Sequence, residues 1–363
     1  MKILQYEQSC TDDRLTYPEY YSHFYPEGRL LFFDIETTGF SADHTTLYLI
    51  GALWYEKDTI RIVQWLNDDG YGERDLLDAF HRLCKEFTHL VHFNGLGFDL
   101  PYLNRKAELL NVPFDIENSL EQIDIYKEMR SYRTLLGLES MKQTAIERFM
   151  GVDRMDTYSG KELIHLYQRY VTTKDPELER TLLLHNHDDL LGMPRISQIL
   201  CYRSFFENPS ILSLNIERES DQVILSFTVA SFTGPPHRLS LSQQGIYLNV
   251  LEQSAILYIP ILSTTLKHYF SDYKNYYYLP AEDMAIHKSV AAFVEPERRQ
   301  KAKKDTCYIK KDGQFIPCPD PDFKERFQIS CSDKPLYQTI ESLEQGTYEA
   351  QQIYIKKTLQ IFL

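Results

Sequence analysis

Two carboxylates at the end of an apolar run are the first residues of this sequence that could carry out chemistry. Residues 30–33 (LLFF) are apolar, and Asp34 and Glu36 follow closely behind them. The run predicts a buried strand, in which residues two apart point to the same face. Like charges about 4 Å apart repel by roughly 4 kcal/mol at an effective dielectric near 20. The pair is therefore solvated, protonated or neutralised by a hard divalent cation such as Mg²⁺.

Two more acidic positions lie later in the chain. Asp99 follows an apolar run and an Asn94-Gly95 turn, where it either caps a helix or joins the first pair. His185 and Asp189 are four residues apart in a segment expected to be helical from about residue 177, so they share one helix face. A solvated polar face is the alternative explanation for this spacing.

These side chains need an alternation of strands and helices to position them. We expect strands at the Asp34 run and over residues 47–55, 59–66, 89–93 and 123–126, with a tight turn at Lys57-Asp58. Helices are expected over residues 75–87, from Asp99 to about residue 110, and through most of 128–206. This order predicts an α/β domain with a mixed sheet and flanking helices, as in the RNase H-like fold.

Composition limits the classes of protein to which this chain can belong. Hydrophobic residues make up 43% of the 363 residues and charged residues 25%, which is typical of a globular chain. A formal charge of −13 argues against attraction of nucleic acid or anionic lipid by the whole surface, but not against a local basic groove. No signal core or membrane-spanning window is present, so no membrane partner is expected. Scattered cysteines without a C-x-x-C pair indicate a cytoplasmic, reduced location.

Three regions are expected along the chain. Residues 1–28 are polar and tyrosine-rich and are interpreted as an N-terminal arm. Residues 29–208 form the α/β domain, and residues 209–363, beginning at Pro209, are interpreted as a smaller β-rich accessory domain of unknown function.

Helices are also expected in the accessory domain, around residues 282–293 and 296–304. The second carries the densest cluster of positive charge in the chain, and three tyrosines at 276–278 precede it. It is either a helix stabilised by its own dipole, with a solvated face, or part of a surface that holds single-stranded nucleic acid. The basic residues of this segment are Arg298, Arg299, Lys301, Lys303 and Lys304.

Taken in order, three segments resemble the DEDD exonuclease superfamily and, more closely, the bacterial YprB-type RNase H-like domain. They are FFDIETTGF, HFNGLGFDLPYL and LLHNHDDL, and the resemblance covers roughly residues 28–200. It implies an RNase H-like mixed sheet and a metal-dependent 3′→5′ exonuclease. Carried over to this chain, the metal-site acids would be Asp34, Glu36, Asp99 and Asp189, with Asp34 bridging two Mg²⁺ or Mn²⁺ ions.

The same resemblance implies roles for four further residues. One branch of the superfamily has a tyrosine four positions before the last aspartate, and another has a histidine five positions before it. This chain departs from both, because His185 occupies the tyrosine position. His185 would position or deprotonate the attacking water. Thr37, Asn94 and Phe98 would line the pocket for the terminal nucleotide.

The resulting prediction is an exonuclease that hydrolyses the phosphodiester bonds of single-stranded DNA or RNA ends by a two-metal mechanism. One alternative is an inactive nucleic-acid-binding or scaffold protein, and another is a metal-dependent phosphohydrolase of small nucleotides. The intact acids argue against the first alternative, because a site without metals would keep the charge repulsion and lose its compensation.

Overall fold

The computed structural model describes residues 1–10, 16–116 and 118–363, which form two compact units, Met1–Arg203 and Ser204–Leu363. Each unit has its own sheets and its own buried residues. All of the candidate site residues belong to the first unit.

A six-stranded mixed sheet forms the centre of the first unit, with the strand order β1-β4-β3-β2-β5-β6. β2 pairs in parallel with β5, and β5 with β6, whereas the pairs β1–β4, β4–β3 and β3–β2 are antiparallel. Strands that are buried on both faces are nearly continuous apolar runs, as the first halves of β2 and β3 are. The strands are β1 (Lys2–Ser9), β2 (Leu30–Thr37), β3 (Leu47–Glu56), β4 (Thr59–Leu66), β5 (His89–His92) and β6 (Glu121–Asp124).

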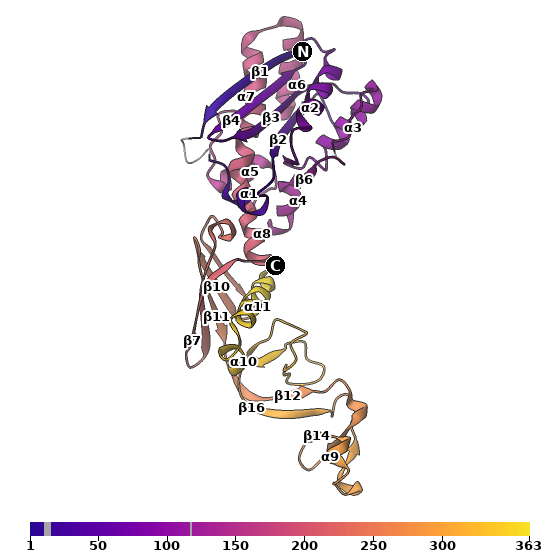
Figure 1. Ribbon diagram of the computed structural model, residues 1–363, viewed down its shortest axis with the longest axis vertical. Coiled ribbons are helices and arrows are strands. Elements are labelled where there is room, and N and C mark those ends of the chain that lie inside the picture. The colour runs from indigo at the N-terminus through magenta and orange to yellow at the C-terminus, as the bar shows by residue number, and fades with distance from the viewer. Residues whose placement is uncertain (11–15, 117) are drawn as a thin grey trace. The chain divides into compact units, whose positions relative to one another are not determined.

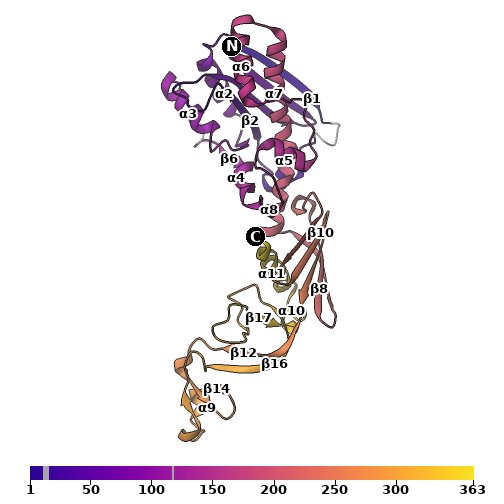
Figure 2. The same cartoon turned by 180° about the vertical axis from the view of Figure 1, so that it is seen from behind.

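Helices cover both faces of this sheet, as Figure 1 shows and Figure 2 repeats from behind. One face packs on α2 and α3 through a core that includes Leu31 and Phe80. The other packs on α6 and α7, which run side by side, through a core that includes Tyr48 and Leu163. The helices are α1 (Glu19–Phe24), α2 (Glu73–Cys84), α3 (Asp99–Leu110), α4 (Ile125–Met129), α5 (Gln143–Met150), α6 (Gly160–Thr173), α7 (Pro176–Ile196) and α8 (Leu200–Glu207).

The expected α/β architecture with a mixed sheet is confirmed, with small shifts at the ends of elements. Lys57 turns the chain between β3 and β4 with φ 55°, the left-handed conformation that tight hairpin turns require. The strand expected over residues 123–126 instead ends at Asp124. Its side chain accepts a hydrogen bond from the Lys127 amide and caps α4, so the next two residues are helical.

The expectation that residues 1–28 form an arm is wrong for the part that the structure describes; residues 11–15 lie outside it. Lys2–Ser9 is β1, and it pairs with β4 from end to end. Tyr21 of α1 is fully buried, and its hydroxyl is hydrogen-bonded to Ser197 Oγ at 2.7 Å. β1 is an edge strand whose side chains are mostly exposed, so it needs no apolar face and gives no strand pattern in the sequence.

The second unit is rich in strands, as expected, and its strands pair antiparallel. A five-stranded sheet has the order β7-β8-β11-β10-β9, and two three-stranded sheets have the orders β12-β16-β17 and β14-β13-β15. Among the described residues of both units, no helix is long and apolar enough to cross a bilayer. The elements are β7 (Ile211–Arg218), β8 (Gln222–Val229), β9 (Leu239–Gln243), β10 (Ile246–Leu251), β11 (Ser254–Pro260), β12 (Leu262–Tyr269), β13 (Tyr276–Leu279), β14 (Met284–His287), α9 (Lys288–Ala291), β15 (Gln300–Lys301), β16 (Tyr308–Pro317), β17 (Tyr337–Thr339), α10 (Ile340–Glu344) and α11 (Tyr348–Leu359).

The two helices expected around residues 282–293 and 296–304 are wrong. The first segment contains strand β14 followed by the single helical turn of α9, and the second is a short 3₁₀ turn followed by β15. Tyr278 packs with Ala285, Ala302 and Cys307 in a small core that exists only when these strands pair through β13. Burial of these side chains outweighs the weak helical preference that the charge pattern suggested.

Candidate metal and catalytic site

β2 presents its two acids on the face that α7 covers. The apolar residues that alternate with them point into the core beneath α2 and α3, so Asp34 and Glu36 point the other way. Asn186 Nδ2 donates a hydrogen bond to Asp34 Oδ2 over 2.9 Å, and His185 Nε2 lies 3.5 Å from Glu36 Oε1. Consecutive residues of one helix therefore contact the two acids of one strand.

A buried chain of amides fixes the orientation of Asp34. Gln64 of β4 donates to Asn186 Oδ1 over 2.8 Å and to the Leu183 carbonyl over 2.9 Å. Gln64 and Asn186 are both fully buried. Gly51 of β3 lies against Asn186, and any side chain at that position would collide with the Asn186 amide. The glycine therefore allows α7 to approach the sheet closely enough for Asn186 to hold one oxygen of Asp34.

Glu36, His185 and Asp189 form a cluster whose geometry suits a metal ion. Each offers one ligand atom, and these atoms all lie within 4.8 Å of one another. The side chains are only 12%, 14% and 15% exposed, so they are largely buried but still open to a small ligand. His185 Nε2 lies 3.4 Å from Asp189 Oδ2, and the Tyr48 hydroxyl donates to Glu36 Oε2 over 3.3 Å.

Asp99 joins the site from the first residue of α3. The N-cap position belongs to Phe98, whose side chain makes no capping bond, so the alternative of Asp99 as a helix cap does not hold. The Asp99 carboxyl is 8% exposed and accepts hydrogen bonds from its own backbone amide and from that of Ile35. Asp99 therefore faces β2 beside the acids of that strand.

Three carboxyls of the site, those of Asp34, Glu36 and Asp99, have raised pKa values. Burial raises the pKa of Asp34 well above its usual value, and the nearby charges of Asp189, Glu36 and Asp99 raise it further. Burial raises the pKa of Glu36 to about 7, although His185 opposes the shift. Burial also raises the pKa of Asp99 to about 7. A bound divalent cation is the usual means by which a protein stabilises such a group of carboxylates in ionised form.

All five residues expected to carry the chemistry thus come together, from β2, the start of α3 and the middle of α7. Residues 31–201 also match the family model of the RNase_H superfamily.

Residues 31–201 form an RNase H-like domain.

Two relatives of known sequence match part of the chain. The uncharacterized protein YprB of Bacillus subtilis (strain 168) is 25% identical over 171 residues, which cover 47% of this chain and 41% of YprB. DNA polymerase 1 of Sulfurisphaera ohwakuensis is 26% identical, covering 25% of this chain and 14% of the polymerase. The chain thus spans less than half the length of the curated relatives that it matches.

Two solved structures show a weak similarity to this chain. The family B DNA polymerase of the archaeon Pyrobaculum calidifontis has a TM-score of 0.43 and 13% identity, covering 92% of this chain and 46% of the polymerase. E. coli exonuclease I in complex with a dT13 oligonucleotide has a TM-score of 0.30 and 14% identity, covering 43% of each chain.

Sequence reasoning missed a charged segment of the RNase H-like domain between α5 and α6. Arg154 Nη1 lies 2.6 Å from Asp189 Oδ1 and 3.1 Å from Glu147 Oε2. Asp156 Oδ2 lies 2.5 Å from His185 Nδ1. Burial lowers the pKa of His185, but the charges of Glu36, Asp189 and Asp156 outweigh it and leave the pKa raised. The segment has no periodic pattern, so its sequence gave no signal of this contact.

The three residues expected to line a nucleotide pocket lie around the same end of β2. Thr37 ends the strand, and its hydroxyl donates to the Gly39 carbonyl over 2.8 Å. Asn94 has φ 63° and lies in the turn before α3, where its backbone N–H donates a hydrogen bond to Asp124 Oδ1 over 2.9 Å. The ring of Phe98 packs edge-to-face with that of Phe40, with 5.8 Å between the ring centres, and Phe40 is 92% exposed. Sequence reasoning did not single out Phe40.

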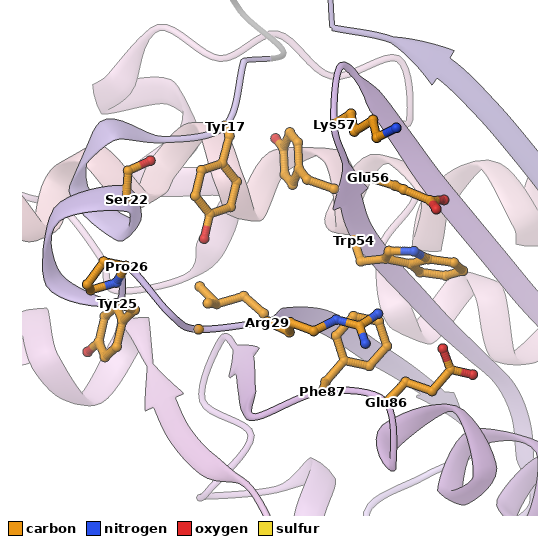
Figure 3. Close-up of a pocket in the computed structure, with 13 residues that line it drawn as sticks. Tyr17, Ser22, Tyr25, Pro26, Arg29, Trp54, Glu56, Lys57, Glu86 and Phe87 are labelled. Atoms are coloured by element: carbon orange, nitrogen blue, oxygen red, sulfur yellow. The ribbon is translucent and has the colours of Figure 1, made fainter.

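A separate hollow of about 560 Å³ lies at the opposite end of β2, away from the acids. Figure 3 shows Tyr17 and Tyr25 on one side of it and Trp54 on the other, with Arg29 lying over Phe87. The Arg29 guanidinium is 5.2 Å from the centre of the Phe87 ring, a cation–π distance. None of the five predicted catalytic residues lines this hollow.

Proposed function

We propose that the RNase H-like domain is a divalent-metal-dependent 3′→5′ exonuclease that hydrolyses phosphodiester bonds at single-stranded DNA or RNA ends. The observation that supports this most directly is the convergence of four carboxyls and one histidine from three separate elements. One relative of known sequence is a DNA polymerase, which agrees with a nucleic-acid substrate.

The donor set fits Mg²⁺ or Mn²⁺. Asp34, Glu36, Asp99 and Asp189 offer carboxylate oxygens, which are the ligands that these hard cations prefer. The raised pKa values of Asp34, Glu36 and Asp99 are those of a group that needs positive charge nearby. Two such cations would supply the charge that lets an anionic phosphodiester enter an acidic site and would stabilise the attacking and leaving oxygens.

His185 is the proposed base for the attacking water. Its Nε2 faces Glu36 and Asp189 at 3.5 and 3.4 Å, so it lies beside the proposed metal ligands and points toward them. A histidine in this place can take a proton from water when the ring is neutral. Asn186, one residue further along α7, would hold Asp34 in place through its 2.9 Å hydrogen bond.

Incubation with end-labelled oligonucleotides tests the proposal. Matched DNA and RNA strands, labelled at either end, are incubated with Mg²⁺, with Mn²⁺ and with chelator. We expect a ladder that shortens stepwise from the 3′ end and disappears in chelator. Absence of shortening with both metals would overturn the proposal in favour of an inactive binding protein. Single nucleotides turned over as readily as oligomers would favour the small-nucleotide phosphohydrolase.

A further inference from the structure

The imidazole of His185 lies between two different sets of acids. On one side, Nε2 is 3.5 Å from Glu36 and 3.4 Å from Asp189, both proposed metal ligands. On the other side, Nδ1 is 2.5 Å from Oδ2 of Asp156, which is 8% exposed and lies outside the proposed metal site. The two ring nitrogens therefore have different neighbours, and only Nε2 is directed toward the proposed metal ligands.

The contact with Asp156 determines which nitrogen carries the proton. An ionised carboxylate can only accept hydrogen bonds, so Nδ1 must be the donor in this short, charge-assisted contact. In the neutral ring this leaves Nε2 without a proton and with a free lone pair. A tyrosine at the same position would need no such partner, because its single hydroxyl has no tautomer to fix. A histidine there does need one.

Asp156 is itself held firmly by α7 and α5. Asp188 Oδ2 accepts hydrogen bonds from the backbone amides of Met155 and Asp156, each over 2.8 Å. Arg154, two residues earlier, bridges Glu147 of α5 and Asp189 of α7. The neighbouring aspartates of α7 thus have different roles. Asp189 faces the proposed metal site, whereas Asp188 holds the segment that carries Asp156.

We infer that Asp156 is a positioning residue that holds His185 as the Nδ1–H tautomer, with Nε2 turned toward the attacking water. The inference rests on the proposed nuclease function but extends it to a residue outside the metal-binding acids. The Asp156 carboxylate also lies 3.7 Å from Arg154 Nη2 and accepts a hydrogen bond from the Tyr158 amide, but its shortest contact is with His185, so its effect on kcat should pass through His185. Loss of Asp156 should therefore lower kcat with little change in KM or in Mg²⁺ or Mn²⁺ affinity.

The kinetics of single and double variants test whether Asp156 acts on catalysis through His185. Partners that orient histidines at metal sites typically contribute about 10–100-fold to activity, so we expect Asp156→Ala to lower kcat by that factor. In a His185→Ala background the same substitution should have no further effect. Asp153→Asn is the matched control, because Asp153 lies in the same segment, carries the same charge and is exposed. It should leave kcat within about twofold of wild type, as surface changes usually do.

Nuclear magnetic resonance of the ring nitrogens gives a readout that does not require activity. With Mg²⁺ bound, the His185 signal, assigned by its absence in His185→Ala, should show the proton on Nδ1 in wild type and in Asp153→Asn. In Asp156→Ala that preference should be lost. The inference is overturned if Asp156→Ala keeps wild-type kcat, lowers kcat equally in the His185→Ala background, or leaves the tautomer unchanged. A wild-type protein that degrades no oligonucleotide but shows the Nδ1–H tautomer would overturn the proposed function and leave the positioning contact established.

Discussion

The acid site of the first unit and the small sheet β13–β14–β15 of the second both concentrate charge, but in opposite ways. In the acid site the charged groups are largely buried, and the ionisation of Asp34 depends on Asp189, Glu36 and Asp99 together. Around β15 the lysines at 301, 303 and 304 are exposed, and among the described residues none of them has an ion pair. Buried charges need specific partners at fixed positions, whereas exposed charges tolerate almost any backbone.

This difference explains which predictions succeeded. The Asp-x-Glu spacing and the His-x-x-x-Asp spacing describe residues that must face one another, so they indicated a strand and a helix that the structure contains. The run of basic residues after Pro296 places no such demand on the backbone, and the helix expected there is instead a turn and a strand.

Asp34→Asn should give the largest effect, because it removes a charge on which the whole acid cluster depends. We expect nuclease activity to fall to the level of the wild-type protein in chelator, while the fold is retained. Asp58→Asn, in the exposed turn between β3 and β4, is the control with the same change of charge. Full metal-dependent turnover in Asp34→Asn would show that the acids do not act as one site. The buried charges of the first unit would then be no more interdependent than the exposed lysines around β15.

His185→Ala should give the next largest effect. Loss of a general base typically costs about 10²–10⁴-fold in rate, so turnover should fall within that range. The affinity for Mn²⁺, measured by calorimetry, should change little if His185 acts on the water and not on the metal. His185→Tyr should recover part of the rate, because it restores the residue found at this spacing in the tyrosine branch. A large loss of Mn²⁺ affinity in His185→Ala would make His185 a metal ligand.

The exposed lysines of the second unit should give a smaller and additive effect. Lys301, Lys303 and Lys304 are changed together to glutamine in the Asp34→Asn background, and oligonucleotide affinity is measured over a series of salt concentrations. Each lost phosphate contact should reduce the slope of log affinity against log salt by about 0.7 for a single strand. Arg299 is left unchanged, because its guanidinium lies 5.0 Å from the Tyr277 ring centre and serves the local packing.

A second triple variant separates a local effect from a change in net charge. It removes three exposed lysines elsewhere in the same unit, namely Lys324, Lys334 and Lys357. If only the first variant flattens the salt slope, the basic segment contacts the strand. If both variants behave alike, or neither changes the slope, the segment around β15 plays no specific part in binding nucleic acid.

The smallest effect should be a change in stability of the metal-free protein. Because the pKa values of Glu36 and Asp99 are raised to about 7, the folded state binds more protons than the unfolded state from about pH 4 to 7. The free energy of unfolding in chelator should therefore fall as pH rises through that window. Asp34→Asn removes part of the repulsion, so its Tm at pH 8 should exceed that of wild type, by about 2–4 °C for each kcal/mol relieved.

Thermal melts in chelator at pH 5 and pH 8 check this sign. The gain from Asp34→Asn should be larger at pH 8 than at pH 5, and Mg²⁺ should raise the Tm of wild type but not of the variant. A lower Tm for Asp34→Asn in chelator would mean that the carboxylate stabilises the fold, most directly through its hydrogen bond with Asn186.

The sequence by itself determined which residues could share a face. The period of two in β2 sends Asp34 and Glu36 to the same side, and the four-residue spacing in α7 does the same for His185 and Asp189. These are properties of the local backbone, so they do not depend on the rest of the fold. The order of strands and helices followed from the same periodicities, and the mixed sheet followed from that order.

Only the tertiary structure decided what lies beside those residues. The contact of Asp156 with His185 joins positions 29 residues apart, and that of Asn186 with Asp34 joins positions 152 apart. The same holds for β1, whose exposed side chains acquire a place in the sheet only by pairing with β4. Such partners are selected by packing, hydrogen bonding and charge compensation across the folded chain, and these leave no periodic trace in the sequence.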